Sequence, residues 1–303
     1  MPGAHVSAQR YPVKPVRIIT SEVGSGTDFA SRLIAQGLSE KWNQRAIVEN
    51  RPSGSIPGEV VSTSAPDGYT LLLGGSAFWL GPLMRSTPYD PITQFAPITM
   101  AVYSPTVLVV HPSLPAKSVK DLIAIAKGKP GALTYASAGP GSITQLLGEW
   151  IKLKSGTNIL DVPYKSVGAE MPDLLGGQIT TGYLVATVIM AHVKSGKLRG
   201  LAVSGRNRLP LLRDVPTMTE GGLPGVEASA WSGYFVPAGV PQPMIHRLNA
   251  ELVRVFKSPD IRDVATATGT EVVGGRPDEF AAFIRAEITK WGGIIKEAGI
   301  KPQ

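Results

Sequence analysis

The sequence has no cysteine among its 303 residues. Disulfide bonds, thiolate catalysis and cysteine-ligated metals are therefore excluded, although the lack of cysteine does not by itself fix the cellular compartment. Charged residues make up only 17% of the chain and aromatic residues 7%, whereas hydrophobic residues make up 43%. This balance excludes wholesale disorder and predicts compact domains with Gly and Pro at their turns.

Long apolar runs are also missing. The uncharged stretch 68–84 is interrupted by glycines and a proline. The apolar stretch 179–191 is shorter than the roughly 20 residues that a membrane-spanning helix needs, so we expect no transmembrane helix. Val6-Ser7-Ala8 has the small residues of a secretory cleavage site, but no basic or apolar region precedes it. We expect an export signal to be absent from this sequence or already removed.

Acidic residues are fewer than basic ones, 23 against 30, which gives a net charge of +7. Such an excess raises the rate of encounter with anions, although its simplest interpretation is a solvated surface. Lys and Arg are scattered and no run interleaves them with aromatic residues. We therefore expect no nucleic-acid partner.

The residues of common catalytic and cofactor sites are also lacking. The four histidines are isolated, without the paired spacing of a zinc site, and Ser76 lacks the following glycine of a nucleophile elbow. Gly24-x-Gly26 and Gly139-x-Gly141 lack the third glycine of a dinucleotide-binding loop, and no Walker A lysine follows either pair. We expect no enzyme activity, no metal and no cofactor.

Strand-like and helical segments alternate along the chain, which is typical of a parallel α/β fold. The expected strands are 16–20, 46–49, 69–73, 107–110, 133–136, 158–162, 179–184 and 198–203, and the expected helices are 28–41, 119–127, 144–154, 169–175, 244–257 and 277–297. The length predicts two α/β lobes. We place lobe 1 at 1–105 plus 233–303 and lobe 2 at 106–232, with crossover segments near 102–110 and 230–237. Such wiring is that of a two-lobe clamshell with the ligand cleft between the lobes.

The most informative pattern occurs once in each half: Gly24-Ser25-Gly26-Thr27 and Gly139-Pro140-Gly141-Ser142. Each follows an extended apolar run and leads into a helix, so each is expected to aim backbone N–H groups at an anion. Ordinary turns with N-caps at Thr27 and Ser142 are the alternative. Two loops placed alike in two lobes favour binding of a carboxylate.

Other side chains are weaker candidates. Ser76 follows a strand and is either a third donor or part of a plain turn. Tyr164 and Lys165 follow another strand and either line the cleft or lie on the surface. Phe78 and Trp79 are expected in the core, with a wall of the ligand site as the alternative.

Several strings in a fixed order resemble the Bug (TctC-like) family, the extracytoplasmic solute-binding proteins of tripartite tricarboxylate transporters. They include Tyr11-Pro12-Val13-Lys14-Pro15, Glu49-Asn50-Arg51-Pro52, Ala65-Pro66-Asp67-Gly68-Tyr69-Thr70, Val162-Pro163-Tyr164-Lys165 and Leu174-Leu175-Gly176-Gly177-Gln178. The resemblance runs over nearly the whole chain. It implies two lobes of the periplasmic-binding-protein type II-like fold, each a central sheet flanked by helices, closing on a small organic acid. It also implies that the loops at Gly24 to Asp28 and at Ser137 to Ser142 hold its carboxylates.

The sequence departs from the family pattern at three places. Glu22 stands in a lead that is usually rich in proline, and it favours an amine or hydroxyl on the ligand. Leu184 and Val185 stand where the family often has Asp-Asn, which favours a less polar or aromatic acid. Ser166-Val167 follows Lys165 where Gly-Ser is common, which changes the backbone contacts expected of that loop.

We therefore interpret the chain as a periplasmic receptor that delivers a small mono- or dicarboxylate, or an aromatic acid, to membrane transporter subunits, and we expect it to be a monomer. The expected ligand-binding residues are Gly24, Ser25, Gly26, Thr27, Asp28, Ser76, Ser137, Gly139, Gly141, Ser142, Tyr164 and Leu184. A ligand-sensing protein that uses the same clamshell to signal to a membrane protein is the alternative. The sequence does not identify the ligand.

Overall fold

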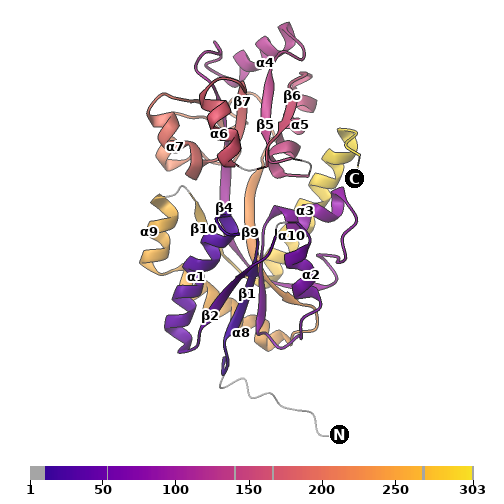
Figure 1. The fold of residues 1–303 in the computed structure, drawn as a ribbon, viewed down its shortest axis with the longest axis vertical. Helices are drawn as coiled ribbons and strands as arrows, with labels where there is room; N and C mark the ends of the chain where they lie inside the picture. Colours follow the sequence, from indigo (N-terminus) through magenta and orange to yellow (C-terminus); the bar gives the residue numbers. More distant parts are fainter. Residues whose placement is uncertain (1–10, 53, 140, 166, 268–269, 302–303) are drawn as a thin grey trace. The chain divides into compact units, whose positions relative to one another are not determined.

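The computed structural model describes residues 11–52, 54–139, 141–165, 167–267 and 270–301. The chain forms two compact units, and each contains strands with helices beside them (Figure 1). Unit 1 comprises the chain up to Val102, Trp231–Val264 and Val272–Ile288. Unit 2 comprises Tyr103–Ala230, Ala265–Glu271 and the chain from Thr289 onward.

The elements follow the expected alternation of strands and helices. Unit 1 holds β1 (Val16–Thr20), α1 (Gly26–Trp42), β2 (Ala46–Asn50), α2 (Ile56–Ser62), β3 (Thr70–Gly74), α3 (Ser76–Met84) and α8 (Gln242–Phe256). Unit 2 holds α4 (Val119–Gly128), β5 (Thr134–Ser137), α5 (Ile143–Ser155), β6 (Leu160–Pro163), α6 (Val167–Leu175), β7 (Thr181–Val185), α7 (Ala186–Lys194), β8 (Arg199–Val203) and η2 (Pro210–Leu212). Residues of both units make up β4 (Phe95–Val110), β9 (Ser229–Pro237), α9 (Pro259–Ala267), β10 (Glu271–Gly274) and α10 (Pro277–Glu297).

Both units contain mixed strand pairings. In unit 1 the strand order is β2-β1-β3-β9-β4, and β1 is parallel to β2 and β3. In unit 2 the order is β4-β7-β5-β6, and β5 is parallel to β6 and β7. The expected parallel pattern thus holds for these strands. It does not hold at β9, which is antiparallel to β3, or at β4, which is antiparallel to β7 and β8.

The helices pack on the strands through apolar stripes. In α1, Ala30, Ile34 and Leu38 are buried in the core of unit 1, as the 3.6-residue period predicts. Gly37 of α1 lets α8 approach closely, because a Cβ there would lie 2.8 Å from Cγ1 of Val255. Among the described residues, no helix combines the length and apolar composition that crossing a bilayer requires.

The compact units differ from the expected lobes at the end of the chain. Residues 265–271 and those from Thr289 onward belong to unit 2, whereas the sequence analysis placed all of 233–303 in lobe 1. Trp291 of α10 packs edge-on against Trp150 of α5, with ring centroids 5.6 Å apart. The apolar face of α10 was expected, but the sequence pattern does not reveal which unit its last turns contact. The lobe boundaries stay a prediction.

Candidate functional site

The first candidate loop joins β1 to α1, and its side chains hold the start of the helix. Ser25 is the N-cap, and its Oγ accepts a hydrogen bond from the Asp28 N–H at 3.1 Å. Asp28 reaches back, and its Oδ2 accepts from the Gly24 N–H at 2.9 Å. The Thr27 hydroxyl lies 3.1 Å from the Ser25 hydroxyl. The loop is therefore fixed by its own first-turn side chains.

Asp28 is only 4% exposed and is fully engaged within the protein. Besides the Gly24 N–H, its carboxylate accepts from Asn50 Nδ2 at 2.8 Å and pairs with Arg32 Nε at 2.9 Å. Burial alone raises the pKa of this carboxyl, but the hydrogen bonds from Gly24 and Asn50 and the Arg32 charge outweigh burial, so the pKa lies below its usual range. Asp28 is thus an anion, and its carboxylate holds the loop in position.

The second candidate loop, between β5 and α5, repeats this wiring. Ser142 is the N-cap, and its Oγ accepts from the Gln145 N–H at 3.2 Å. Oε1 of Gln145 accepts from the Gly141 N–H at 2.8 Å. The hydroxyls of Ser142 and Thr144 are 3.1 Å apart. The spacing of Ser142 and Gln145 is that of a capping box, but the Gln145 side chain bonds the residue before the N-cap rather than the N-cap itself.

This wiring corrects the frame in which the two loops were matched. The sequence analysis aligned Gly24 with Gly139 because both begin a Gly-x-Gly triplet. The hydrogen bonds instead align Ser25 with Ser142, which pairs Gly24 with Gly141. Of the two N-caps named in the alternative interpretation, Ser142 is present, whereas the first N-cap is Ser25 and not Thr27. A single string of glycines is a poor guide here because the cap, not the glycine, sets where the helix starts.

The two loops differ in the group beneath them. In unit 2 the place of the Asp28 carboxylate is taken by the neutral Gln145 amide, whose Nε2 donates to Asp161 Oδ2 at 2.9 Å. This bond orients the amide so that its oxygen faces Gly141. Oδ1 of Asp161 is buried and has no hydrogen-bond partner among the described residues. The Asp28 carboxylate therefore bonds the first loop directly, whereas the Asp161 carboxylate reaches the second loop only through the Gln145 side chain.

This pattern of hydrogen bonds does not by itself mark a ligand site, because the start of α4 has it too. Oγ of Ser118 accepts from the Asp121 N–H at 3.1 Å, and Asp121 Oδ2 accepts from the Lys117 N–H at 2.9 Å. The candidate loops differ from this ordinary cap in their glycines, which have φ of +84° at Gly24 and +75° at Gly141. In both loops the first helical N–H groups, which no helix satisfies internally, follow the carboxyl end of a parallel strand.

Ser76 lies beside the first loop. It is the first residue of α3, and its N-cap Gly75 makes no side-chain hydrogen bond. A Cβ on Gly75 would lie 3.1 Å from Cγ2 of Thr27, so the turn before α3 lies against the first candidate loop. The Ser76 side chain is half-buried. The segment was expected as a turn or a donor, and the helix that begins there was missed.

The remaining candidates in unit 2 are Ser137, Tyr164 and Leu184, and their side chains are hydrogen-bonded or packed within the protein. Ser137 is fully buried, its Oγ accepts from the Gly139 N–H at 3.2 Å, and its carbonyl accepts from the Tyr164 N–H at 2.8 Å. The Tyr164 hydroxyl donates to Asp173 Oδ2 at 2.7 Å; burial and this bond raise its pKa to about 12. Leu184 is 3% exposed and lies in the core of unit 2. Its side chain is thus a packing group in this structure.

Two aromatic residues near Ser76 are also packing groups. Phe78 is 3% exposed, and Trp79 is completely buried and stacks on Trp231 with ring centroids 4.6 Å apart. The expected core role of both is confirmed. The sequence analysis missed four residues that hold the loops in place: Asn50, Thr144, Gln145 as a loop anchor, and Asp161. Gln145 alone left a usable signal, through its spacing from Ser142.

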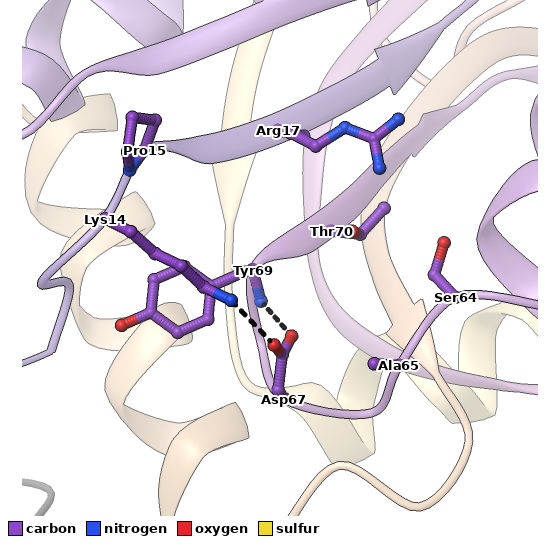
Figure 2. A pocket seen from close by; sticks show the side chains of 8 residues that line it. All are labelled: Lys14, Pro15, Arg17, Ser64, Ala65, Asp67, Tyr69 and Thr70. Carbon is purple, nitrogen blue, oxygen red and sulfur yellow. Dashed lines mark hydrogen bonds and ion pairs between the residues drawn. The ribbon is translucent and has the colours of Figure 1, made fainter.

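A cavity of about 330 Å³ lies elsewhere in unit 1, at the amino ends of β1 and β3 rather than at the loops that follow their carboxyl ends (Figure 2). Lys14 Nζ pairs with Asp67 Oδ2 at 3.2 Å, and Arg17 makes two bonds of 2.6 and 2.9 Å with Glu49. Since these cations already have anionic partners, the cavity is a poor site for a carboxylate.

The same region fastens the start of the described chain. The Tyr11 hydroxyl donates to the Gly68 carbonyl at 2.6 Å, and the Val13 N–H donates to the Tyr69 hydroxyl at 3.1 Å. Arg247 of α8 donates to the Tyr11 carbonyl at 2.5 Å. We call these three bonds the tyrosine latch. Two strings that carried the family resemblance thus meet in a structural contact.

Known proteins resemble this chain along nearly all of its length. The family model described as tripartite tricarboxylate transporter family receptor matches residues 30–300. Protein BugT of Bordetella pertussis is 35% identical over 305 residues, which cover 99% of this chain and 94% of BugT.

Solved structures agree with these matches. R. palustris Rpa4515 with adipate has 32% identity and a TM-score of 0.86, covering 97% of this chain and 100% of that one. Periplasmic binding protein BugD has 30% identity and a TM-score of 0.83, with coverage of 97% and 100%. MatC from Rhodopseudomonas palustris with bound malate has 26% identity and a TM-score of 0.82, with coverage of 94% and 100%. The expected two-lobe α/β fold of periplasmic binding proteins is confirmed.

Proposed function

Because the chain belongs to the receptors of the tripartite tricarboxylate transporter family, we propose that its two helix-start loops bind the carboxylates of a small organic acid. The resemblance to the Bug family is confirmed, and the chain is a solute-binding protein for such a transporter. The family consists of receptors, and we propose that this member has no catalytic activity. Its neighbours are periplasmic binding proteins, which supports a periplasmic location.

The observation that carries the proposal is the matched pair of loops, one in each unit. Each offers the free N–H groups of a first helical turn and two hydroxyls, Ser25 and Thr27 in one loop and Ser142 and Thr144 in the other. Backbone N–H groups and hydroxyls at a helix start suit a carboxylate, because the helix dipole adds to their hydrogen bonds. Two such loops favour a dicarboxylate, with one carboxylate at each. The relatives solved with adipate and malate carry dicarboxylates, which supports this choice.

The contacts beneath the loops suggest how each site residue acts. We propose that Ser25, Gly26 and Thr27 with Ser76 donate in unit 1, and that Ser142 and Thr144 donate in unit 2. Gly141, whose N–H is bonded to Oε1 of Gln145, positions the second loop. Asp28, Ser137, Gly139 and Tyr164 position these donors, because their polar groups are engaged within the protein or shape the turn. Leu184 and Val185 bring no hydrogen bond to the ligand, so a ligand with an apolar middle is favoured.

The decisive test is a thermal-shift and calorimetric screen with adipate, malate, glutamate and benzoate at two salt concentrations. A ligand present at 100 times its Kd stabilises the folded protein by about 2.7 kcal/mol, which is readily measured. We expect a dicarboxylate to raise Tm most. If none of the acids changes Tm or releases heat, the ligand class is wrong.

The loops are tested with Thr27→Val and Thr144→Val, which remove one hydroxyl each and keep both N-caps. We expect each to weaken binding of the best acid about tenfold, the effect of losing about 1.4 kcal/mol. Ser118→Ala is the control for stability: it removes the N-cap of α4, outside both candidate loops, and so shows what a loss of stability alone does to affinity. It should cost about 1 kcal/mol of stability and leave affinity unchanged. Equal affinity of both threonine variants and the wild type would show that the site is misplaced.

A further inference from the structure

A buried acid in unit 2 has no role in the proposed site. Glu170 lies in the first turn of α6 and is only 4% exposed. Its Oε1 is shielded from solvent and has no hydrogen-bond partner among the described residues. Buried carboxyl oxygens are normally paired, so this one calls for a physical explanation.

The carboxyl occupies space that a glycine leaves open. A Cβ on Gly182 of β7 would lie 3.2 Å from Glu170 Oε1 and 3.2 Å from Cδ2 of Leu174. The same Cβ would lie 3.6 Å from Cδ1 of Leu184. The carboxyl is therefore seated over the backbone of β7 between two leucine side chains.

Among the described residues, no cation pairs with the carboxyl. On its own helix and in the segment before it, the titratable groups are Asp173 and Tyr164, which are hydrogen-bonded to each other, and Lys165, which is exposed. From β7 it meets Gly182 and Leu184, which do not titrate, while Tyr183 lies against Tyr135 on the other side of the strand. The remaining core around α6 is apolar, including Ala136 of β5 and Ile189 of α7.

An ionised carboxylate in such a place is costly, because burial removes water from Oε1 and no donor among the described residues replaces it. Burial raises the pKa of Glu170 to about 7 from its ordinary 4.5. The folded protein then holds this proton on the order of 10²-fold more tightly than an exposed glutamate does. The acid is therefore protonated at pH values well below 7 and ionises as the pH rises through about 7.

We propose that Glu170 is a proton-operated switch in unit 2. When protonated, it lets α6 lie flat on β7. When ionised, it draws in water or lifts the first turn of α6. That turn follows directly on the segment of Tyr164 and Lys165, whose backbone is bonded to Ser137 below the second loop. The protonation state of Glu170 is thereby linked to the rigidity of the second candidate loop. The inference does not depend on which acid the receptor binds.

The sign of the effect follows from the raised pKa. Stability from this group is fully present below about pH 4.5, falls as pH rises through about 7, and is constant above that. We expect the wild-type Tm to fall between pH 5 and 8 more steeply than that of Glu170→Gln. Glu59→Gln is the matched control, since Glu59 lies in the first turn of α2 but is exposed. Its pH profile should parallel that of the wild type.

Two further measurements keep the proposal testable if Glu170→Gln does not fold. The side-chain ¹³C signal of Glu170 in the wild-type protein, identified by its loss in Glu170→Leu, should titrate near pH 7. Amide exchange in residues 164–175, corrected for the intrinsic pH dependence, should speed up severalfold between pH 6 and 8. A titration near 4.5, or parallel Tm profiles of wild type and Glu170→Gln, would overturn the switch. Loss of ligand binding would bear only on the preceding proposal.

Discussion

Replacing Asp28 with Asn tests the claim that a buried anion organises the first loop. Asn keeps one acceptor oxygen, whereas the carboxylate accepts from Gly24, Asn50 and Arg32. One buried N–H donor then loses its partner, which costs about 1–3 kcal/mol. The lost pair with Arg32, whose side chain is 55% exposed, adds less than about 1 kcal/mol. We therefore expect the free energy of unfolding to fall by about 2–3 kcal/mol at pH 7.

The effect of this substitution depends on pH in a defined direction. The pKa of Asp28 is lowered by folding, so its contribution is present above the unfolded pKa of about 3.9 and is lost as pH falls below that. Urea unfolding at pH 7 and pH 3 measures the loss of stability and its pH dependence. Arg32→Ala is the control, because it removes the ion pair but keeps the Asp28 carboxylate. The control should lose less than about 1 kcal/mol. A difference between Asp28→Asn and wild type below about 0.5 kcal/mol at pH 7, or one that persists unchanged at pH 3, would refute the role given to this carboxylate.

Further predictions concern packing and the second loop. Gly148→Ala should destabilise the protein by about 1–3 kcal/mol in urea unfolding, because its Cβ would lie 2.4 Å from Cε2 of Tyr135. Gly293→Ala, in a helix with nothing within 4 Å of the new Cβ, should instead stabilise it by about 0.5–1 kcal/mol; the same sign for both would contradict the packing described. Asp161→Leu should free the Gln145 amide and speed amide exchange at Gly141 by about tenfold, whereas Asp161→Asn, which keeps an acceptor, should restore slow exchange. Unchanged exchange in Asp161→Leu would mean that Gln145 is oriented by other contacts.

The sequence predicts the elements with strong periodicity best. Strand β1 and helix α10 have the expected bounds, because their apolar spacing has one interpretation. Helix α3 was missed because two glycines precede it and Pro82 lies within it, and these residues are typical of turns. Strand β4 is 16 residues long, yet only its last four were predicted. Its first part contains prolines, which usually argue against a strand.

Less of the candidate site than of the fold could be predicted from the sequence. The two loops were identified from their glycines, but the frame that relates them depends on hydrogen bonds between Ser25 and Asp28 and between Ser142 and Gln145. Asn50 and Asp161 reach the loops from neighbouring strands, and no local spacing encodes such contacts. Glu170 looks in sequence like any polar residue at a helix start. Only the fold places it over a glycine of another strand.

The tyrosine latch has a practical consequence for attaching this receptor to a surface or a dye. It fastens Tyr11 and Val13 at the amino ends of β1 and β3, whereas the first candidate loop follows their carboxyl ends. The five residues of β1 separate these two ends of unit 1 by about 15 Å. A linker joined ahead of Tyr11 therefore leaves from the end of the strands away from the loop. Immobilisation through that linker leaves Ser25 and Thr27 unobstructed, which suits the chain to use as a sensor element.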